Sequence, residues 1–220
     1  MERLDKMKQI GLIFGGDSEI GQWVSRELKK NNIEAIKIPR QIVNTGLHAD
    51  ITIYDDVLEV IRLIGLQSCQ VSYIFVCAGT TERSYIDKSI ISEWINTIDV
   101  NLIGPYHIYK ALVQSELWKD TQIKLIVFGS TSIVSRPKEH SAYSVSKVAL
   151  EQLVTYINNS PPCNIRASCL RLGTCQTSFS SDSHKENIIQ EEDIALIIRL
   201  LINCRCAILP ETITLRPINS

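Results

Sequence analysis

Tyr143 and Lys147 lie four residues apart in the segment Ala-Tyr-Ser-Val-Ser-Lys, and Ser130 lies thirteen residues before the tyrosine. If this segment is helical, the tyrosine and the lysine share one helix face, and the ammonium group can approach the phenol. A free tyrosine has a pKa of about 10, and a nearby positive charge lowers that pKa toward the range useful for acid–base catalysis. Ser130 follows the apolar run Leu125–Phe128, so at the end of a strand it can hold a carbonyl or hydroxyl group against the same phenol.

Taken alone, Tyr143 and Lys147 also fit a solvated helix face. The elements around them must therefore distinguish a catalytic pair from a surface pair. Short β-like runs alternate with longer amphipathic stretches, which is typical of parallel strands joined by crossover helices. The sequence therefore predicts an α/β protein: a single-domain Rossmann fold with a doubly wound parallel sheet and helices on both faces. The expected strands are Ile10–Phe14, Ala35–Ile38, Tyr73–Val76, Leu125–Phe128, Arg166–Arg171 and Cys206–Leu209, and the expected helices are Ile20–Asn31, Tyr54–Leu66, Ser92–Glu116, Ala142–Asn158 and Glu191–Cys204.

Composition narrows the class of protein. The chain has 220 residues, of which 45% are hydrophobic and 21% charged, and this fits one globular domain spanning residues 1–220. The net charge is −1 with no basic excess, so we expect no nucleic-acid partner. No apolar run approaches the roughly 20 residues that span a bilayer, and the charged N-terminus is unlike a signal peptide, so we expect no membrane partner.

Seven cysteines are scattered along the chain, and Cys204 and Cys206 are separated by one residue. A close pair of this kind can bind a metal or carry redox chemistry, but no second pair or histidine cluster accompanies it. An odd number of cysteines without an export signal is typical of a reducing compartment. We therefore expect reduced thiols, no metal site and a cytoplasmic location.

The first expected strand leads into Gly15-Gly-Asp-Ser-Glu-Ile-Gly21 and then into a helix. Gly15 permits a tight turn and Gly21 permits close packing, while the helix start offers free N–H groups and a positive dipole end to an anion. This geometry suits the pyrophosphate of a dinucleotide. The match to a three-glycine fingerprint is imperfect, because Glu19 occupies the middle glycine position.

The second expected strand ends in Ile36-Lys-Ile-Pro-Arg40. An acidic residue near this point accepts hydrogen bonds from the ribose hydroxyls of NAD, whereas an arginine accommodates the 2′-phosphate of NADP. Pro39 stands in place of an acid and Arg40 follows it. The sequence therefore favours NADP(H) over NAD(H), with an ordinary surface arginine as the alternative.

Together these residues resemble the short-chain dehydrogenase/reductase family in its single-domain form, over nearly the whole chain. The stretch from Gly15 to Gly21 resembles the family's TGxxxGxG turn, and Asp50-Ile51 resembles the pair that meets the adenine. The resemblance implies a catalytic tetrad of Asn101, Ser130, Tyr143 and Lys147. It implies cofactor contacts from Gly15, Asp17, Ser18, Glu19, Ile20, Gly21, Arg40, Asp50, Ile51, Cys77, Ala78, Gly79, Tyr143, Lys147, Gly173, Cys175 and Thr177.

Other segments extend this resemblance, with departures from the family pattern. Cys77-Ala78-Gly79 resembles the NAG element, the stretch from Arg171 to Thr177 resembles the PGxxxT segment beside the nicotinamide, and Ile208–Pro217 resembles the closing strand. The departures do not touch the tetrad: Phe14 replaces Thr, Glu19 replaces Gly, Cys77 replaces Asn, Leu172 replaces Pro and Pro210 stands where Gly is often found.

The resemblance implies an oxidoreductase that interconverts a carbonyl and an alcohol by hydride transfer. Tyr143 is then the general acid or base, Ser130 orients the substrate oxygen, and Lys147 lowers the tyrosine pKa and binds the nicotinamide ribose. Asn101 is expected to hold a water that connects Lys147 to solvent. The polar segment Gly173–Asn187 is expected to be a substrate lid or a tolerated surface loop.

Two other functions and an oligomeric state remain open from the sequence. The chain can be a non-catalytic NADP-binding sensor or scaffold, or a sugar-nucleotide epimerase or dehydratase, although 220 residues leave little room for the extra substrate domain of the latter. Cationic side chains at Arg136, Lys138 and His140 suit an anionic substrate or simply a solvated loop. The resemblance also implies a homodimer or homotetramer, in which some of the apolar residues of the helices Ser92–Glu116 and Ala142–Asn158 would form the interface.

Overall fold

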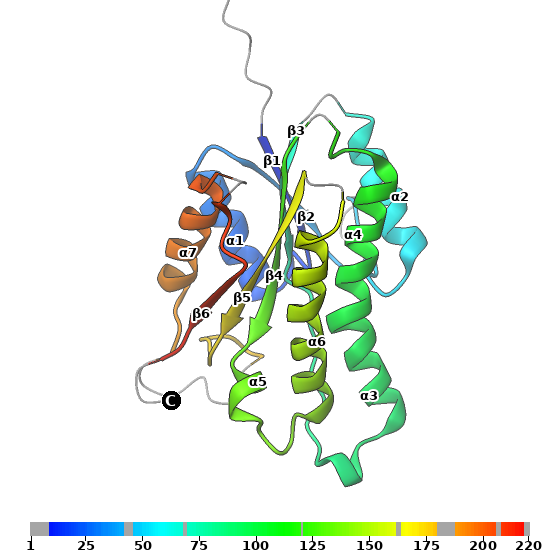
Figure 1. The fold of residues 1–220 in the computed structure, drawn as a ribbon, viewed down its shortest axis with the longest axis vertical. Coiled ribbons are helices and arrows are strands. Elements are labelled where there is room, and N and C mark those ends of the chain that lie inside the picture. Colours follow the sequence, from blue (N-terminus) through cyan, green and yellow to red (C-terminus); the bar gives the residue numbers. More distant parts are fainter. Residues whose placement is uncertain are drawn as a thin grey trace, which may run out of the picture.

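The computed structural model describes residues 9–41, 46–67, 70–119, 121–161, 164–179, 188–205 and 208–217. Within these residues, a parallel six-stranded sheet has the order β2-β1-β3-β4-β5-β6 and lies between two layers of helices (Figure 1). The predicted doubly wound α/β fold is therefore confirmed. The strands are β1 (Gln9–Phe14), β2 (Glu34–Ile38), β3 (Gln70–Val76), β4 (Ile123–Ser130), β5 (Ile165–Leu172) and β6 (Thr212–Leu215).

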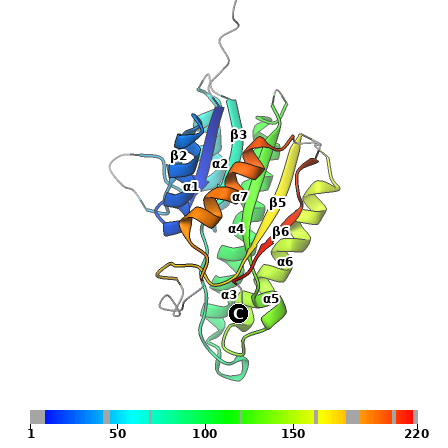
Figure 2. The same cartoon turned by 90° about the vertical axis from the view of Figure 1, so that its left-hand side faces the viewer.

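Helices cover both faces of the sheet. Helices α1 (Glu19–Lys30) and α7 (Glu191–Asn203) pack together on one face, as Figure 2 shows from that side. The other face carries α2 (Tyr54–Gly65), α4 (Gly104–Ser115) and α6 (Ser141–Asn158). The shorter elements are η1 (Ile86–Lys88), α3 (Ile91–Ile98), η2 (Asp99–Ile103) and α5 (Ser132–Ser135). None of the described helices is long and apolar enough to cross a bilayer.

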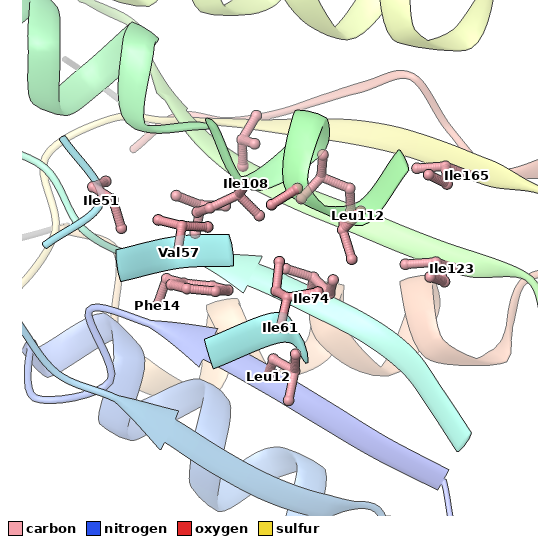
Figure 3. Close-up of a cluster of buried hydrophobic side chains, with 14 of the residues drawn as sticks. Leu12, Phe14, Ile51, Val57, Ile61, Ile74, Ile108, Leu112, Ile123 and Ile165 are labelled. Carbon is pink, nitrogen blue, oxygen red and sulfur yellow. The ribbon is translucent and has the colours of Figure 1, made fainter. Parts of the chain in front are cut away.

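The alternation of side chains along each strand produces two hydrophobic cores. In β1, Leu12 and Phe14 face the α2–α4 layer, whereas Ile13 between them belongs to the cluster beneath α1 and α7. All three side chains are fully buried. Figure 3 shows the first core, where Leu12 and Phe14 meet residues from α2, β3 and α4. Because both faces of the sheet are covered, its strands are almost continuously apolar.

The chain reverses direction across the sheet between β1 and β3. From β1 it moves outward to β2, and it then returns to place β3 on the opposite side of β1. In an open parallel sheet, ligands bind at such a switch point, outside the carboxyl ends of the strands. The loops that follow β1, β3, β4 and β5 therefore determine the binding site.

Two expected elements differ from the structure. The single helix expected over Ser92–Glu116 is divided into α3, the π-helical turn η2 and α4. The strand expected at Cys206–Leu209 is also wrong: residues 206 and 207 lie outside the described chain, and the last strand is β6, which starts only at Thr212. Pro210 lacks the backbone N–H that a strand ladder requires, so pairing begins beyond it. Strand β6 lies within Ile208–Pro217, the segment that the family resemblance indicated.

Candidate active site

A cleft of about 900 Å³ opens at the carboxyl ends of the strands. Two residues of the expected set, Gly21 and Asn101, lie behind its wall. The expected residues that line the cleft are Gly15, Asp17, Ser18, Glu19, Ile20, Arg40, Asp50, Ile51, Cys77, Ala78, Gly79, Ser130, Tyr143, Lys147, Gly173, Cys175 and Thr177. A second, polar cavity of about 580 Å³ includes Gln9, Gln70 and Gln122 at the opposite ends of the strands. The chemistry predicted from the sequence therefore belongs to the first cleft.

The glycine turn between β1 and α1 is packed too tightly for larger residues. Gly15 has a φ of +75°, and a Cβ atom there would lie 2.5 Å from the backbone nitrogen of Ala78. A Cβ atom at Gly21 would lie 2.4 Å from the carbonyl oxygen of Gly15. Ser18 closes the turn, because its Oγ donates to the Gly15 carbonyl at 2.7 Å and accepts from the Gly21 N–H at 3.0 Å. The turn thus brings backbone to the floor of the cleft, where a pyrophosphate needs close approach.

Glu19, which replaces the usual middle glycine, connects the turn to the segment after β5. Its Oε2 accepts hydrogen bonds from the Ser178 backbone N–H at 2.7 Å and from the Ser178 hydroxyl at 2.6 Å. The segment that contains Gly173 and Thr177 is therefore held across the mouth of the cleft. The expected lid extends beyond it, but residues 180–187 lie outside the described chain.

Arg40 and Asp50 both line the cleft and form an ion pair, with 2.8 Å between Nε and Oδ2. Asp50 also accepts from the Thr52 backbone N–H at 3.0 Å and from its hydroxyl at 2.7 Å. Burial, the largest single influence, raises the pKa of Asp50, but the hydrogen bonds from Thr52 and Arg40 outweigh it and the net pKa is lowered. The Arg40 side chain remains 67% exposed, so its guanidinium is accessible beside the ion pair.

Tyr143 and Lys147 lie on one face of α6, with the Lys147 Nζ 5.5 Å from the centre of the tyrosine ring. The Nζ atom donates to the carbonyl oxygen of Phe128 at 2.8 Å, near the end of β4. Lys147 is only 5% exposed. This burial disfavours the charged form and lowers its pKa to about 8. The amino group consequently changes its charge within about two pH units of neutrality.

The pKa of Tyr143 is raised above its ordinary value near 10. Burial of the phenol is the largest cause, and a side-chain hydrogen bond with Ser130 acts in the opposite direction. From the sequence, the charge of Lys147 alone predicted a lowered pKa for Tyr143. The net direction in the folded protein is the reverse, because desolvation outweighs the stabilisation of the phenolate.

Asn101 is fully buried within the π-helical turn η2. Its Oδ1 accepts from the Thr80 N–H at 2.9 Å, and its Nδ2 donates to the Thr80 carbonyl at 2.8 Å and to the Ser146 hydroxyl at 3.1 Å. Single π-helical turns inside α-helices are frequent at functional sites. Asn101 thus fixes the loop after β3 to helix α6. Its partner on the helix, Ser146, lies between Tyr143 and Lys147 in the sequence.

The loop that follows Gly79 supplies cleft residues that the sequence argument missed. Arg83 donates from Nη2 to the carbonyl oxygen of Phe179 at 2.9 Å, and the Phe179 ring lies 6.0 Å from the Tyr143 ring. Glu82 belongs to the same loop and is buried behind the cleft lining. The place of this loop in the sequence could have indicated these residues. The loop continues from the carboxyl end of a strand, where ligands bind in such sheets.

Comparison with known proteins identifies the class to which this fold and site correspond. The family model for short chain dehydrogenases matches residues 9–188. Dehydrogenase/reductase SDR family member 4 from Homo sapiens is 35% identical over 103 residues, which cover 44% of this chain and 37% of that protein. An uncharacterized oxidoreductase from Staphylococcus epidermidis is 21% identical over 158 residues, covering 66% of this chain and 68% of that protein.

Solved structures share the fold over nearly the full length. An alcohol dehydrogenase from Thermococcus sibiricus, complexed with 5-hydroxy-NADP, has a TM-score of 0.81 at 20% identity and covers 98% of both chains. ElxO with NADP bound has a TM-score of 0.83 at 18% identity, covering 95% of this chain and 97% of that one. The chain belongs to the short-chain dehydrogenase family, and the resemblance read from its sequence is confirmed.

The buried amino group of Lys147 makes a prediction about stability and pH. Its pKa of about 8 in the folded protein lies below the value near 10.4 of an exposed lysine. Between these values the unfolded chain binds more protons, so Lys147 makes stability rise with pH, and its desolvation cost is fully present below about pH 8. Lys147→Met removes this cost. The free energy of unfolding of the variant minus that of wild type should therefore decrease by a few kcal/mol between about pH 7.5 and about pH 10.

Urea unfolding of both proteins across this pH range measures the difference between their free energies of unfolding. Contributions from titrating groups that both proteins share cancel in this difference. The matched control is Lys29→Met, which removes an exposed lysine from α1 and therefore no burial cost. A Lys147→Met difference that stays constant across the range would contradict the assigned burial cost.

Proposed function

We propose that this protein is an NADP(H)-dependent oxidoreductase that interconverts a small-molecule carbonyl compound and its alcohol. The observation that carries the proposal is the meeting of Ser130, Tyr143 and Lys147 in the same cleft as the glycine turn. Because the glycine turn and Tyr143 line one cleft, a single bound dinucleotide would contact both of them. The cleft volume of about 900 Å³ accommodates a bound cofactor and leaves space for a small substrate.

The residues of the cleft fit a nicotinamide dinucleotide. The Gly15 turn admits a pyrophosphate because it presents backbone without side chains, and the start of α1 favours an anion. Arg40 and Asp50 lie where the adenosine end would be held, and Gly79 and Lys147 lie near the opposite end. When bound, the cofactor supplies the hydride, and the protein supplies orientation and electrostatics.

Tyr143 is proposed to donate a proton to the carbonyl oxygen during reduction and to accept it back during oxidation. Its raised pKa keeps the phenol protonated at neutral pH, which suits a proton donor. Ser130 hydrogen-bonds the phenol and can orient the substrate oxygen beside it. Lys147, cationic below about pH 8, favours the phenolate after the proton has left.

Replacement of Tyr143 by Phe tests the acid–base assignment. Loss of one positioned acid–base group should lower turnover by roughly 10²–10⁴-fold. Cofactor affinity should change little, because the phenol ring and its packing are kept. The readout is NADPH consumption with a panel of aldehydes and ketones, alongside a direct cofactor titration. Tyr156→Phe, on the exposed side of the same helix, is the control, and a Tyr143→Phe enzyme with wild-type turnover would overturn the assignment.

Preference for NADP(H) is proposed to depend on Arg40. A charge-assisted hydrogen bond contributes about 1.5–3 kcal/mol, and each 1.4 kcal/mol is tenfold in affinity. Arg40→Ala should therefore weaken NADPH binding about tenfold or more while leaving NADH binding almost unchanged. Nucleotide fluorescence titration measures both, with the exposed Arg62→Ala as the control. Equal losses for the two cofactors would remove Arg40 as the 2′-phosphate contact.

A homo-oligomer is also proposed, because α3, α4 and α6 carry exposed apolar side chains. Those on α3 and α4 include Ile91, Ile95 and Tyr106, and those on α6 are Val145, Val148 and Tyr156. A charge at Val148 should dissociate a dimer or tetramer that forms through this face, since buried unpaired charges are costly. Analytical ultracentrifugation of Val148→Glu tests this, with Leu63→Glu on α2 as the control. A monomeric wild-type protein would reject the proposal.

A further inference from the structure

Glu82 is a buried carboxylate for which the mechanism above has no use. It lies in the loop after β3, three residues beyond Gly79, and only 4% of it is exposed. Acidic side chains are almost never fully buried unless they are paired or hydrogen-bonded. The partners of Glu82 therefore indicate why the fold keeps a carboxylate at this place.

The carboxylate binds the first turn of α6, the helix that carries Tyr143. Its Oε1 accepts from the Ala142 N–H at 2.6 Å and from the Ser141 hydroxyl at 3.1 Å. Its Oε2 accepts from the Tyr143 N–H at 3.1 Å. Both backbone donors belong to the start of the helix, where N–H groups have no intrahelical partner.

Helix α6 is not capped by the side chain of its own N-cap residue. The residue at the N-cap position is His140, and within the described chain its side chain makes no capping hydrogen bond. Glu82 supplies the cap from sixty residues earlier in the sequence. A negative group at this position is also favoured by the positive end of the helix dipole, which offsets part of its desolvation.

Other contacts extend this connection through the loop that carries Glu82. Two residues before it, the Thr80 backbone exchanges two hydrogen bonds with Asn101. One residue after it, Arg83 binds the carbonyl of Phe179, whose ring lies beside Tyr143. The loop therefore holds the catalytic tyrosine from its backbone and also fixes two of the groups around it.

We propose that Glu82 is the positioning residue of Tyr143: its carboxylate clamps the first turn of α6 and thereby sets the place of the phenol in the cleft. This inference rests on the proposed oxidoreductase function. Because Glu82 binds the Tyr143 N–H itself, release of the carboxylate frees the helix start where the phenol is attached. A displacement of about 1 Å in a reacting group can cost on the order of 10²-fold in rate.

The test compares Glu82→Ala and Glu82→Gln with wild type in two independent measurements. The first is steady-state kinetics, in which Glu82→Ala should lower kcat by roughly 10–100-fold. KM for the cofactor and its directly titrated affinity should remain within about twofold, since the glycine turn and Arg40 are untouched. Glu82→Gln keeps the shape but only one acceptor oxygen, so its kcat should lie between the two.

The second measurement is amide hydrogen exchange at Ala142 and Tyr143, which needs no turnover. Both amides should lose protection in Glu82→Ala, while amides in the later turns of α6 keep theirs. The matched control is Asn158→Ala, at the far end of the same helix, where Asn158 exchanges hydrogen bonds with the Ala167 backbone at 2.8 and 3.0 Å. It should destabilise the helix end without lowering kcat.

The outcomes separate this inference from the proposed function. Absence of turnover in wild type would reject the oxidoreductase, and exchange would still report whether Glu82 clamps the helix. Unchanged protection in Glu82→Ala would overturn the clamp. Lost protection with unchanged kcat, or an equal loss of kcat in Asn158→Ala, would show that Glu82 supports structure only and would overturn its positioning role.

Discussion

The buried amino group of Lys147 is the constraint on which the arrangement of the site depends. A lysine with 5% of its surface exposed loses most of its hydration, so the fold must replace the lost hydrogen bonds to water. Part of this compensation comes from the Phe128 carbonyl, 2.8 Å away. Helix α6 must therefore lie close over β4, and an ion pair one turn further along, between Glu151 and Arg171 of β5, holds it there at 2.6 Å. A bidentate pair of this kind fixes orientation as well as distance.

The cleft has two halves that are built by different means. In the half that contains the glycine turn, backbone is brought close by glycine, and Ser18 completes the turn with its hydroxyl. In the half that contains Tyr143, side chains from separate elements are fixed by polar contacts: Asn101 holds the loop after β3, and Glu82 holds the start of α6. The Glu19–Ser178 hydrogen bonds connect the two halves across the mouth of the cleft. The two halves of the cleft are thus connected by hydrogen bonds.

Local spacing and periodicity are what the sequence could reveal. Tyr143 and Lys147 share a helix face because four residues complete about one turn, and the alternating apolar segments predicted the doubly wound sheet. The π-helical turn around Asn101 escaped detection, since the apolar pattern continues through it from α3 into α4. The last strand was misplaced because β6 is short and half exposed, so its apolar signal is weak.

Contacts between distant segments could not be predicted in the same way. Glu82 and Ala142 are sixty residues apart, and Glu19 and Ser178 are 159 residues apart, so nothing in the local pattern connects them. The direction of the Tyr143 pKa also depends on burial, which sequence spacing does not report. Spacing alone indicated a nearby cation and therefore a lowered pKa. The folded protein adds the desolvation that reverses this direction.

The reaction proposed for the cleft is hydride transfer between a nicotinamide and a carbonyl carbon. The most direct measurement uses NADPH carrying deuterium at C4 of the nicotinamide, in either prochiral position, with a panel of aldehydes and ketones. The account predicts one deuterium on the carbinol carbon of the product alcohol for each NADP formed, from one of the two labelled cofactors. Tight cofactor binding without deuterium transfer to any compound of the panel would contradict it.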